Sequence, residues 1–320
     1  MLELLYIIKY RGGIRLKKVL KPVLLVIAGL LVILSGLFPG TSTGLAAANK
    51  DQSTVVDLKA MTFNLRYKNN NDPSPHTWDE RVPTIKKLIN MENPDIIGTQ
   101  EVLYTQLQDL ENTLPKYNWI GLGREGGNRG EYSAIFYKEK DYTVLEYDHF
   151  WLSDTPEVIG SKTWGNNIPR MVTWAKFLDK KSNQQFYFVN THFDHQSDNA
   201  REKSAELILE VTNEFDPELP VILTGDFNAA PDSLPHQILT SGGAFEDLWE
   251  TAETRINENL GTFNGFDDPT GEGPDRRIDW ILGKGNLTTN EIEIVNYQKN
   301  GQFPSDHFPV MADITLTYNK

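Results

Sequence analysis

From residue 51 onward, short apolar runs alternate along the chain with amphipathic segments. Runs rich in Val, Ile, Phe, Tyr and Trp, with polar turns at both ends, are typical of β-strands. This pattern predicts strands at residues 55–64, 95–100, 132–137, 143–152, 171–178, 185–192, 221–224, 278–282 and 309–318. Because the four runs between residues 132 and 192 follow one another through polar turns, we expect them to form an antiparallel section.

Helical spacing of apolar side chains appears between these runs. Helices are predicted at residues 80–90 and 103–114, and Pro115 would end the second. Apolar residues three and four positions apart predict a third helix over residues 200–215, which Asp198 could cap. No internal repeat or low-complexity tract marks a second domain, so residues 49–320 are predicted to form one continuous α/β domain.

The composition permits one large core and makes the surface acidic. The 320 residues are 39% hydrophobic and carry a formal net charge of −13. The first 48 residues hold six of the 31 basic side chains and one of the 44 acidic ones, so the remainder has a formal charge of −18. No basic stripe compensates this charge, and extended binding to nucleic acid is therefore disfavoured. The absence of cysteine excludes disulfides and thiolate metal sites.

Residues 1–48 have the order of a targeting segment. Basic residues precede an apolar run at residues 23–38, and alanines follow it: Arg15, Lys17, Lys18 and Lys21, then Ala46, Ala47 and Ala48. This order predicts a signal peptide cleaved after Ala48. An uncleaved membrane anchor is the alternative, although a run of about 16 residues is short for a bilayer span. In both cases the domain would lie on the outer side, so we expect a secreted or extracytoplasmic protein.

Polar residues suited to phosphate ester hydrolysis follow several predicted strands. Asn64, Glu101, His192 and Asp226 each stand at or just beyond the end of an apolar run. If those strands share a direction within their sheets, the four side chains converge on one cleft. Oxygen ligands for a divalent metal, a base for water and hydrogen-bond donors for the phosphoryl oxygens would then meet there.

Each of these residues also has a purely structural interpretation. Asn64 could cap a turn after its strand, and Glu101 could form a buried salt bridge. Asp226 and Asn228 could belong to a simple Asx turn. His307 could be a core histidine that a neighbouring aspartate satisfies.

Six short motifs, in this order, resemble those of the endonuclease/exonuclease/phosphatase superfamily. They are Thr62-Phe63-Asn64, Gln100-Glu101, Asn190-Thr191-His192, Gly225-Asp226-Phe227-Asn228, Arg277-Ile278-Asp279 and Ser305-Asp306-His307-Phe308-Pro309. Stretches such as Gly130-Glu131-Tyr132-Ser133 look closest to a bacterial branch of metal-dependent hydrolases. The resemblance implies a four-layer α/β sandwich of the deoxyribonuclease I type, with two packed mixed sheets flanked by helices and a cleft at one edge.

The resemblance also implies a metal site. Glu101 would be the main carboxylate ligand, with Asn64 as a ligand or as a partner of a metal-bound water, and Asp306 would assist. Hard oxygen ligands suit Mg²⁺, with Mn²⁺ as an alternative.

Catalytic roles follow from the same resemblance. Asp226 would orient or deprotonate the attacking water, and Asn228 would donate to the phosphoryl oxygens. His307, held by Asp279, would contact the scissile phosphate and take part in proton transfer, while His192 would be a second imidazole donor. The reaction would be in-line attack of water on phosphorus without a covalent enzyme intermediate.

A weaker set of residues is expected around the cleft. Arg170 is a candidate phosphate anchor, although pairing with an internal acid is equally consistent with the sequence. Tyr132 and His195 are candidates for substrate contact, and a tyrosine in a strand is usually core. Trp78 and Arg81 could shape the mouth of the site or begin a solvated helix.

The leading functional hypothesis is an exported Mg²⁺-dependent phosphoesterase. Its substrate would be a mono- or diester such as a sugar phosphate, an inositol phosphate or a lipid head group. An extracellular nuclease is the first alternative, which the acidic charge disfavours. A non-catalytic binding module is the second, disfavoured because every expected acidic, amide and imidazole position is filled. We expect a monomer that contacts membranes only through its N-terminal segment.

Overall fold

The computed structural model describes residues 5–10, 13–18 and 53–319. The chain divides into two compact units, Met1–Asp51 and Gln52–Lys320. In the first unit, β1 (Leu5–Tyr10) and β2 (Gly13–Lys18) form an antiparallel pair. The apolar run and the alanines of the predicted signal peptide lie outside the described residues, so cleavage and export stay predictions. Within the described ranges, no helix has both the length and the apolar character needed to cross a bilayer.

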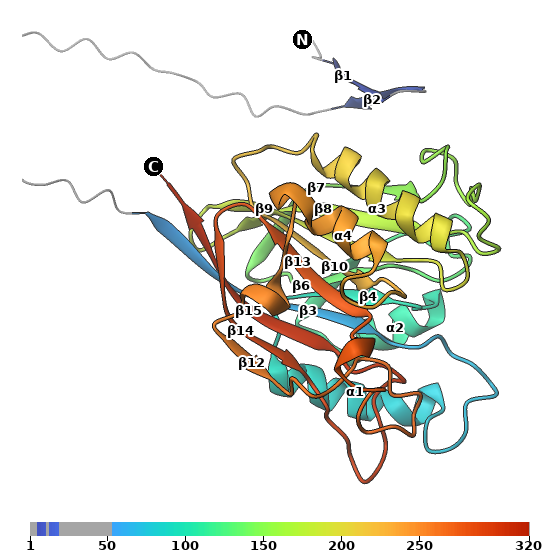
Figure 1. The fold of residues 1–320 in the computed structure, drawn as a ribbon. Coiled ribbons are helices and arrows are strands. Elements are labelled where there is room, and N and C mark those ends of the chain that lie inside the picture. Colours follow the sequence, from blue (N-terminus) through green and yellow to red (C-terminus); the bar gives the residue numbers. More distant parts are fainter. Residues whose placement is uncertain (1–4, 11–12, 19–52, 320) are drawn as a thin grey trace, which may run out of the picture. The chain divides into compact units, whose positions relative to one another are not determined.

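The second unit is built on two mixed sheets, as the sequence predicts (Figure 1). The seven-stranded sheet has the spatial order β12 (Thr254–Ile256), β14 (Leu287–Ile294), β15 (Val310–Tyr318), β3 (Thr54–Asn64), β4 (Ile96–Gln100), β6 (Ile135–Lys138) and β5 (Tyr117–Ile120). The six-stranded sheet has the order β11 (Glu246–Asp247), β13 (Asp279–Lys284), β10 (Val221–Asp226), β9 (Gln185–His192), β8 (Met171–Asp179) and β7 (Tyr142–Trp151).

Helices cover the outer faces of both sheets and complete four layers (Figure 1). α1 (Trp78–Glu92) and α2 (Tyr104–Thr113) pack on the seven-stranded sheet, whereas α3 (Asp198–Thr212) and α4 (Leu234–Thr240) pack on the six-stranded sheet. The short α5 (Leu248–Thr251) follows β11. Three buried apolar clusters fill the spaces between the layers.

Strand β3 shows how the sequence pattern produces these layers. Its side chains alternate in direction, so Leu58 and Ala60 enter the core between the sheets while Met61 and Phe63 pack under the helices. Both faces are apolar because both are covered. The same alternation directs Asn64, at the end of the strand, toward the space between the two sheets.

Two details of the sequence prediction are wrong. The strand expected at residues 132–137 is β6, which pairs with β4 and β5 in the seven-stranded sheet, so the antiparallel section contains only β7, β8 and β9. The cap of α3 is Ser197, whose Oγ accepts a hydrogen bond from the backbone N–H of Ala200 at 3.1 Å. Asp198, expected as the cap, is the first residue of the helix.

A buried polar network joins the two sheets just beneath the strand ends. Gln100 Nε2 on β4 donates to Asn190 Oδ1 on β9 at 2.7 Å, and the same oxygen accepts from Thr224 Oγ1 on β10 at 3.1 Å. Asn190 Nδ2 donates back to the carbonyls of Thr99 and Ala134. All the side-chain partners are fully buried. Loss of one bond would therefore leave a buried polar group without a partner and lower the free energy of unfolding.

Glycine at position 98 permits this network. A Cβ built on Gly98 would collide with Thr224 Oγ1 and Asn190 Oδ1. The close approach of β4 to β9 and β10 therefore depends on the missing side chain.

We predict that Asn190→Ala lowers the free energy of unfolding by about 2–4 kcal/mol, because it leaves several buried donors and acceptors without partners. Urea denaturation measures this change. The matched control is Asn112→Ala, since the Asn112 side chain is exposed and donates only to Gln108 O within α2. A loss at position 190 no larger than at position 112 would show that the network does not stabilise the contact between the sheets.

Candidate active site

Parallel strand pairs bring the sequence-predicted residues to one edge of the molecule. β3 and β4 run parallel with Asn64 opposite Gln100, and β9 and β10 run parallel with His192 opposite Asp226. The expected convergence is therefore present, because the carboxyl ends of each pair lie at the same edge. Asp279, at the start of the antiparallel β13, lies opposite Asp226 and joins the group.

Asn64 connects the two halves of the site. Its Nδ2 lies 3.2 Å from Glu101 Oε1, 2.9 Å from Asp226 Oδ2 and 3.4 Å from His307 Nε2. Its Oδ1 accepts from the backbone N–H of Arg66 at 3.0 Å, which fixes the orientation of the amide. The expectation that Asn64 supplies an oxygen ligand does not fit this orientation, since the nitrogen faces the carboxylates.

Glu101 is positioned by a tight backbone turn. It follows β4 with φ of 64°, a left-handed conformation that is uncommon for a residue with a side chain. Its Oε2 accepts from the backbone N–H of Tyr67 at 3.3 Å. The side chain is half-buried, so one end of the carboxylate can be reached from the pocket that it lines.

Asp226 has the chemistry of a base. Burial, together with the charge of the neighbouring Asp279, raises the pKa of Asp226 to about 7. Its Oδ1 accepts from the backbone N–H of Asn228 at 2.9 Å, in a turn where Asn228 has φ of 48°. A carboxylate that titrates near neutral pH is suited to accept a proton from water.

His307 is held as predicted. Its Nδ1 lies 2.9 Å from Asp279 Oδ2, and its Nε2 points to Asp226 Oδ2 at 3.8 Å. Burial by itself lowers the pKa of His307, but the charge and the hydrogen bond of Asp279 raise that pKa well above 6.5. Thr262 Oγ1 accepts the backbone N–H of Asp279, and the Phe263 ring packs edge-on against the imidazole.

His192 differs from His307 in charge. Burial and the guanidinium groups of Arg170 and Arg124 lower the pKa of His192 well below 6.5, so the ring is neutral at pH 7. Asn228 Nδ2 lies 3.0 Å from His192 Nε2 and also donates to the carbonyl of Phe193. Because Nε2 then accepts, the ring carries its proton on Nδ1.

Asp306 has different partners from those expected. The Asp306 carboxylate lies 3.6 Å from Arg66 Nη1 and accepts from Ser305 Oγ at 3.3 Å. Among the described residues, two groups are close enough to share an ion, Glu101 with His192 and Asp226, and Asp226 with Asp279 and His307. Asp306 belongs to neither group.

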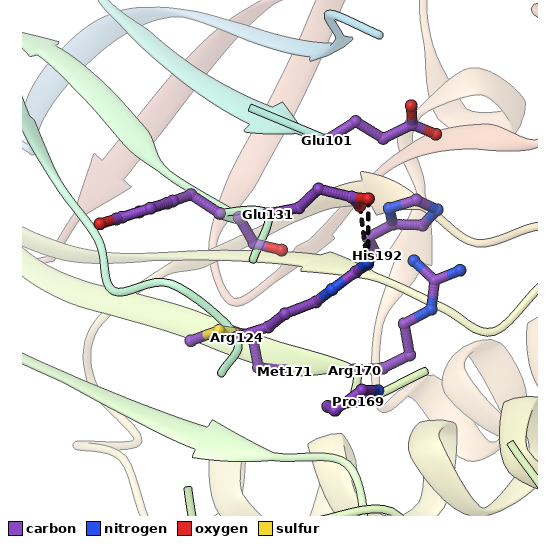
Figure 2. Close-up of a pocket in the computed structure, with 9 residues that line it drawn as sticks. Glu101, Arg124, Glu131, Pro169, Arg170, Met171 and His192 are labelled. Atoms are coloured by element: carbon purple, nitrogen blue, oxygen red, sulfur yellow. Dashed lines mark hydrogen bonds and ion pairs between the residues drawn. The ribbon is translucent and has the colours of Figure 1, made fainter. Parts of the chain in front are cut away.

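A small pocket adjoins the cluster on the Glu101 and His192 side. It is lined by Glu101, Arg124, Glu131, Tyr132, Ser133, Pro169, Arg170, Met171 and His192, most of which are labelled in Figure 2. Arg170 is 5% exposed, and its Nε is 3.7 Å from Asp194 Oδ2. Arg170 therefore pairs with an internal acid, which the sequence allowed as one alternative, and it also lines the pocket.

The remaining substrate-contact candidates are less central. Tyr132 lines the pocket but is buried, and its hydroxyl lies 3.0 Å from Gly127 O, to which it donates. His195 is exposed, with Nδ1 at 3.0 Å from Arg170 Nη2. The sequence did not single out Arg124 as part of the site. A basic residue in the glycine-rich segment at residues 121–130 was the available signal for Arg124.

The two-sheet fold and this group of carboxylates, amides and imidazoles define a metal-dependent hydrolase of phosphoester bonds. The profile of the Endonuclease/Exonuclease/phosphatase family matches residues 61–307. The chain belongs to this family, and the deoxyribonuclease I-type fold expected from the resemblance is confirmed.

Similar proteins include bacterial members of the family. A family protein from Bacteroides thetaiotaomicron is 36% identical, with a TM-score of 0.77 over 83% of this chain and 99% of that one. A mannosyl-6-phosphatase from the same organism is 35% identical, with a TM-score of 0.75 over 80% of this chain and 99% of that one. A protein of Acanthamoeba polyphaga mimivirus is 32% identical over 251 residues, which are 74% of this chain and 92% of that protein.

We predict that Asp279→Asn lowers the pKa of His307, because the substitution removes the charge that favours the imidazolium. In the parent, the pKa of His307 is higher in the folded state than its ordinary value of 6.5. Protonated His307 therefore contributes its full stabilisation to the fold below pH 6.5, and this stabilisation is lost as the pH rises through the folded-state pKa. NMR titration of the histidine rings in metal-free protein measures the shift. Asp275→Asn, at an exposed position, is the charge-matched control. An unchanged His307 titration in the Asp279 variant would contradict the prediction.

Proposed function

We propose that this protein is a Mg²⁺-dependent phosphomonoesterase that acts on a phosphorylated sugar. The observation that carries the proposal is the pocket beside the carboxylate and imidazole cluster, whose wall contains the buried guanidinium of Arg170. A guanidinium in a site of low dielectric binds phosphate oxygens strongly. The 35% identity to a mannosyl-6-phosphatase across 99% of that protein supports a sugar phosphate as the substrate class.

The residues present fit a divalent cation. Glu101 and Asp226 each offer a carboxylate oxygen, and these oxygens lie within 4.8 Å of each other. Burial raises the pKa of both Asp226 and Asp306, the charges of Asp279 and Glu101 respectively act in the same direction, and a bound cation would favour the ionised carboxylates. Oxygen donors favour Mg²⁺ over softer metals, and Glu101 is the proposed main ligand. When bound, the ion supplies neutralisation of charge on the phosphoryl oxygens.

The chain's own residues supply proton transfer and orientation. Asp226 accepts a proton from the attacking water, which its pKa of about 7 permits at neutral pH. Asn64, which donates to both Glu101 and Asp226, holds the two carboxylates at a fixed separation. This arrangement orients the water for in-line attack on phosphorus.

Imidazole and amide groups stabilise the charge that develops on the phosphoryl group. His307 is protonated at pH 7 and offers Nε2–H, while Asp279 fixes its ring. His192 and Asn228 form a hydrogen-bonded pair beside Asp226. His192 is proposed as a further donor through its Nδ1–H, and Asn228, whose Nδ2 binds His192 and Phe193 O, is proposed to orient that ring. Asp306 is proposed to support the metal side indirectly by holding Arg66, whose backbone N–H fixes Asn64.

A substrate panel tests the proposal. With Mg²⁺, we expect mannose 6-phosphate and p-nitrophenyl phosphate to be hydrolysed at least about tenfold more efficiently than bis(p-nitrophenyl) phosphate or plasmid DNA. EDTA and Glu101→Gln should each abolish phosphate release, whereas Glu125→Gln, on an exposed part of the neighbouring loop, should not. Faster cleavage of DNA would instead identify a nuclease, and no turnover with any metal would identify a binding module.

We further predict that Asp226→Asn lowers kcat by about 10³-fold or more, because it keeps the shape of the side chain and removes the base. The urea midpoint should stay close to that of the parent. Asp141→Asn changes an exposed carboxylate in the same way and serves as the control. Activity within a few fold of the parent, or a variant that does not fold, would remove Asp226 from the proposed role.

A further inference from the structure

Two charged residues of the pocket have no part in the chemistry proposed above. Arg124 Nη1 donates to Glu131 Oε2 at 2.7 Å, and Nη2 donates to Glu131 Oε1 at 2.9 Å, so the two groups meet in a bidentate pair. The side chains are 14% and 17% exposed. They therefore remain accessible from the pocket, in which Figure 2 shows the pair drawn with Glu101 and His192.

The pair is not needed to hold its own loop. The backbone N–H of Arg124 donates to Glu131 O at 2.9 Å, and the backbone N–H of Gly123 donates to Gly127 O at 3.0 Å. Tyr132 is anchored separately, because its backbone N–H donates to Val102 O at 2.8 Å. These main-chain bonds already fix the turn, so the two side chains are free to serve another purpose.

The pocket lies on the side of the site that suits a leaving group. Glu101 and His192 line it, whereas Asp226, which would orient the attacking water, does not. In-line displacement puts the leaving group opposite the attacking water. With the phosphate held by Arg170 and on the Glu101 side of this pocket, the alcohol that leaves would lie against the neighbouring Arg124 and Glu131.

The chemistry of the pair selects among such alcohols. Glu131 keeps lone pairs outside its two bonds to Arg124, and each Nη of Arg124 keeps a second N–H outside those bonds. A hydroxyl both donates and accepts, so it can bind to either member of the pair. A second phosphate would need an unpaired cation, but Glu131 already neutralises Arg124 and would repel the phosphate.

We propose that the Arg124–Glu131 pair is a specificity subsite that binds the hydroxyl groups of a singly phosphorylated sugar and disfavours substrates with a second phosphate. This inference rests on the proposed phosphomonoesterase function and names the part of the substrate that the pocket recognises. Arg124 and Glu131 bind the leaving group, while Arg170 and the metal side bind the phosphate.

The test compares three substrates: mannose 6-phosphate, p-nitrophenyl phosphate, whose leaving group has no sugar hydroxyls, and mannose 1,6-bisphosphate, which carries a second phosphate. We expect Glu131→Gln to lower kcat/KM for mannose 6-phosphate by about 10- to 100-fold more than for p-nitrophenyl phosphate, which has no hydroxyls. The same variant frees Arg124, so the ratio of mannose 1,6-bisphosphate to mannose 6-phosphate turnover should rise. Arg124→Lys keeps the charge but loses the fork, and it should also lower the mannose 6-phosphate to p-nitrophenyl phosphate ratio.

Glu125→Gln is the control, because Glu125 is exposed on the same loop, and this variant should leave the substrate ratios unchanged. An equal loss on all three substrates in Glu131→Gln would show that the pair is structural. Unchanged turnover of all three substrates would show that the pair makes no contact with the substrate. Either result overturns the inference.

A binding measurement separates this inference from the reaction itself. Calorimetry with Mg²⁺ measures mannose 6-phosphate and inorganic phosphate binding to Asp226→Asn, with and without Glu131→Gln. We expect the second substitution to weaken mannose 6-phosphate binding at least about tenfold more than phosphate binding. If Glu131 affects binding in this way but the parent hydrolyses no monoester, the proposed reaction fails and the subsite stands. If the parent is active and Glu131 has no selective effect, the reaction stands and the subsite fails.

Discussion

The contact between the two sheets is the constraint on which the site depends. Glu101 and Asn64 are carried by one sheet, and His192 and Asp226 by the other, so the distance between the sheets sets the distance between the halves of the site. A purely apolar interface would fix that distance only loosely, because apolar contacts are not directional. The buried amide of Asn190 adds direction, since its bonds are satisfied in one relative position of the sheets.

Three ionisable groups of one cluster differ in protonation state, and burial together with the charges next to each group explains the differences. Burial and Asp279 raise the pKa of Asp226 to about 7, while Asp279 raises that of His307 well above 6.5. His192 faces arginines instead, and its pKa falls well below 6.5. The surroundings of each side chain therefore make Asp226 a base, His307 a cation and His192 a neutral imidazole.

The sequence predicted the chemistry of the site better than the contacts around it. Strand-end positions placed Asn64 and Asp226 correctly, because alternation and strand direction are local properties of the chain. Arg81, expected at the mouth or on a solvated helix, is fully buried and donates to the carbonyls of Leu65 and Pro304. Pro304 is 223 residues from Arg81 in the sequence, and no local pattern predicts so distant a partner. The orientation of the Asn64 amide likewise depends on a turn that only the folded backbone defines.

The acidic surface and the anionic substrate are compatible because they act at different distances. A formal charge of −18 on residues 49–320 repels long polyanions, which must approach over a wide surface. A small phosphate ester needs only the pocket, where the guanidinium of Arg170 is close by and water screens it little. Arg124, neutralised by Glu131, adds hydrogen-bonding groups there without adding net charge. Under the proposed function, this balance of charge would favour a small monoester over a nucleic acid, both across the whole molecule and within the pocket.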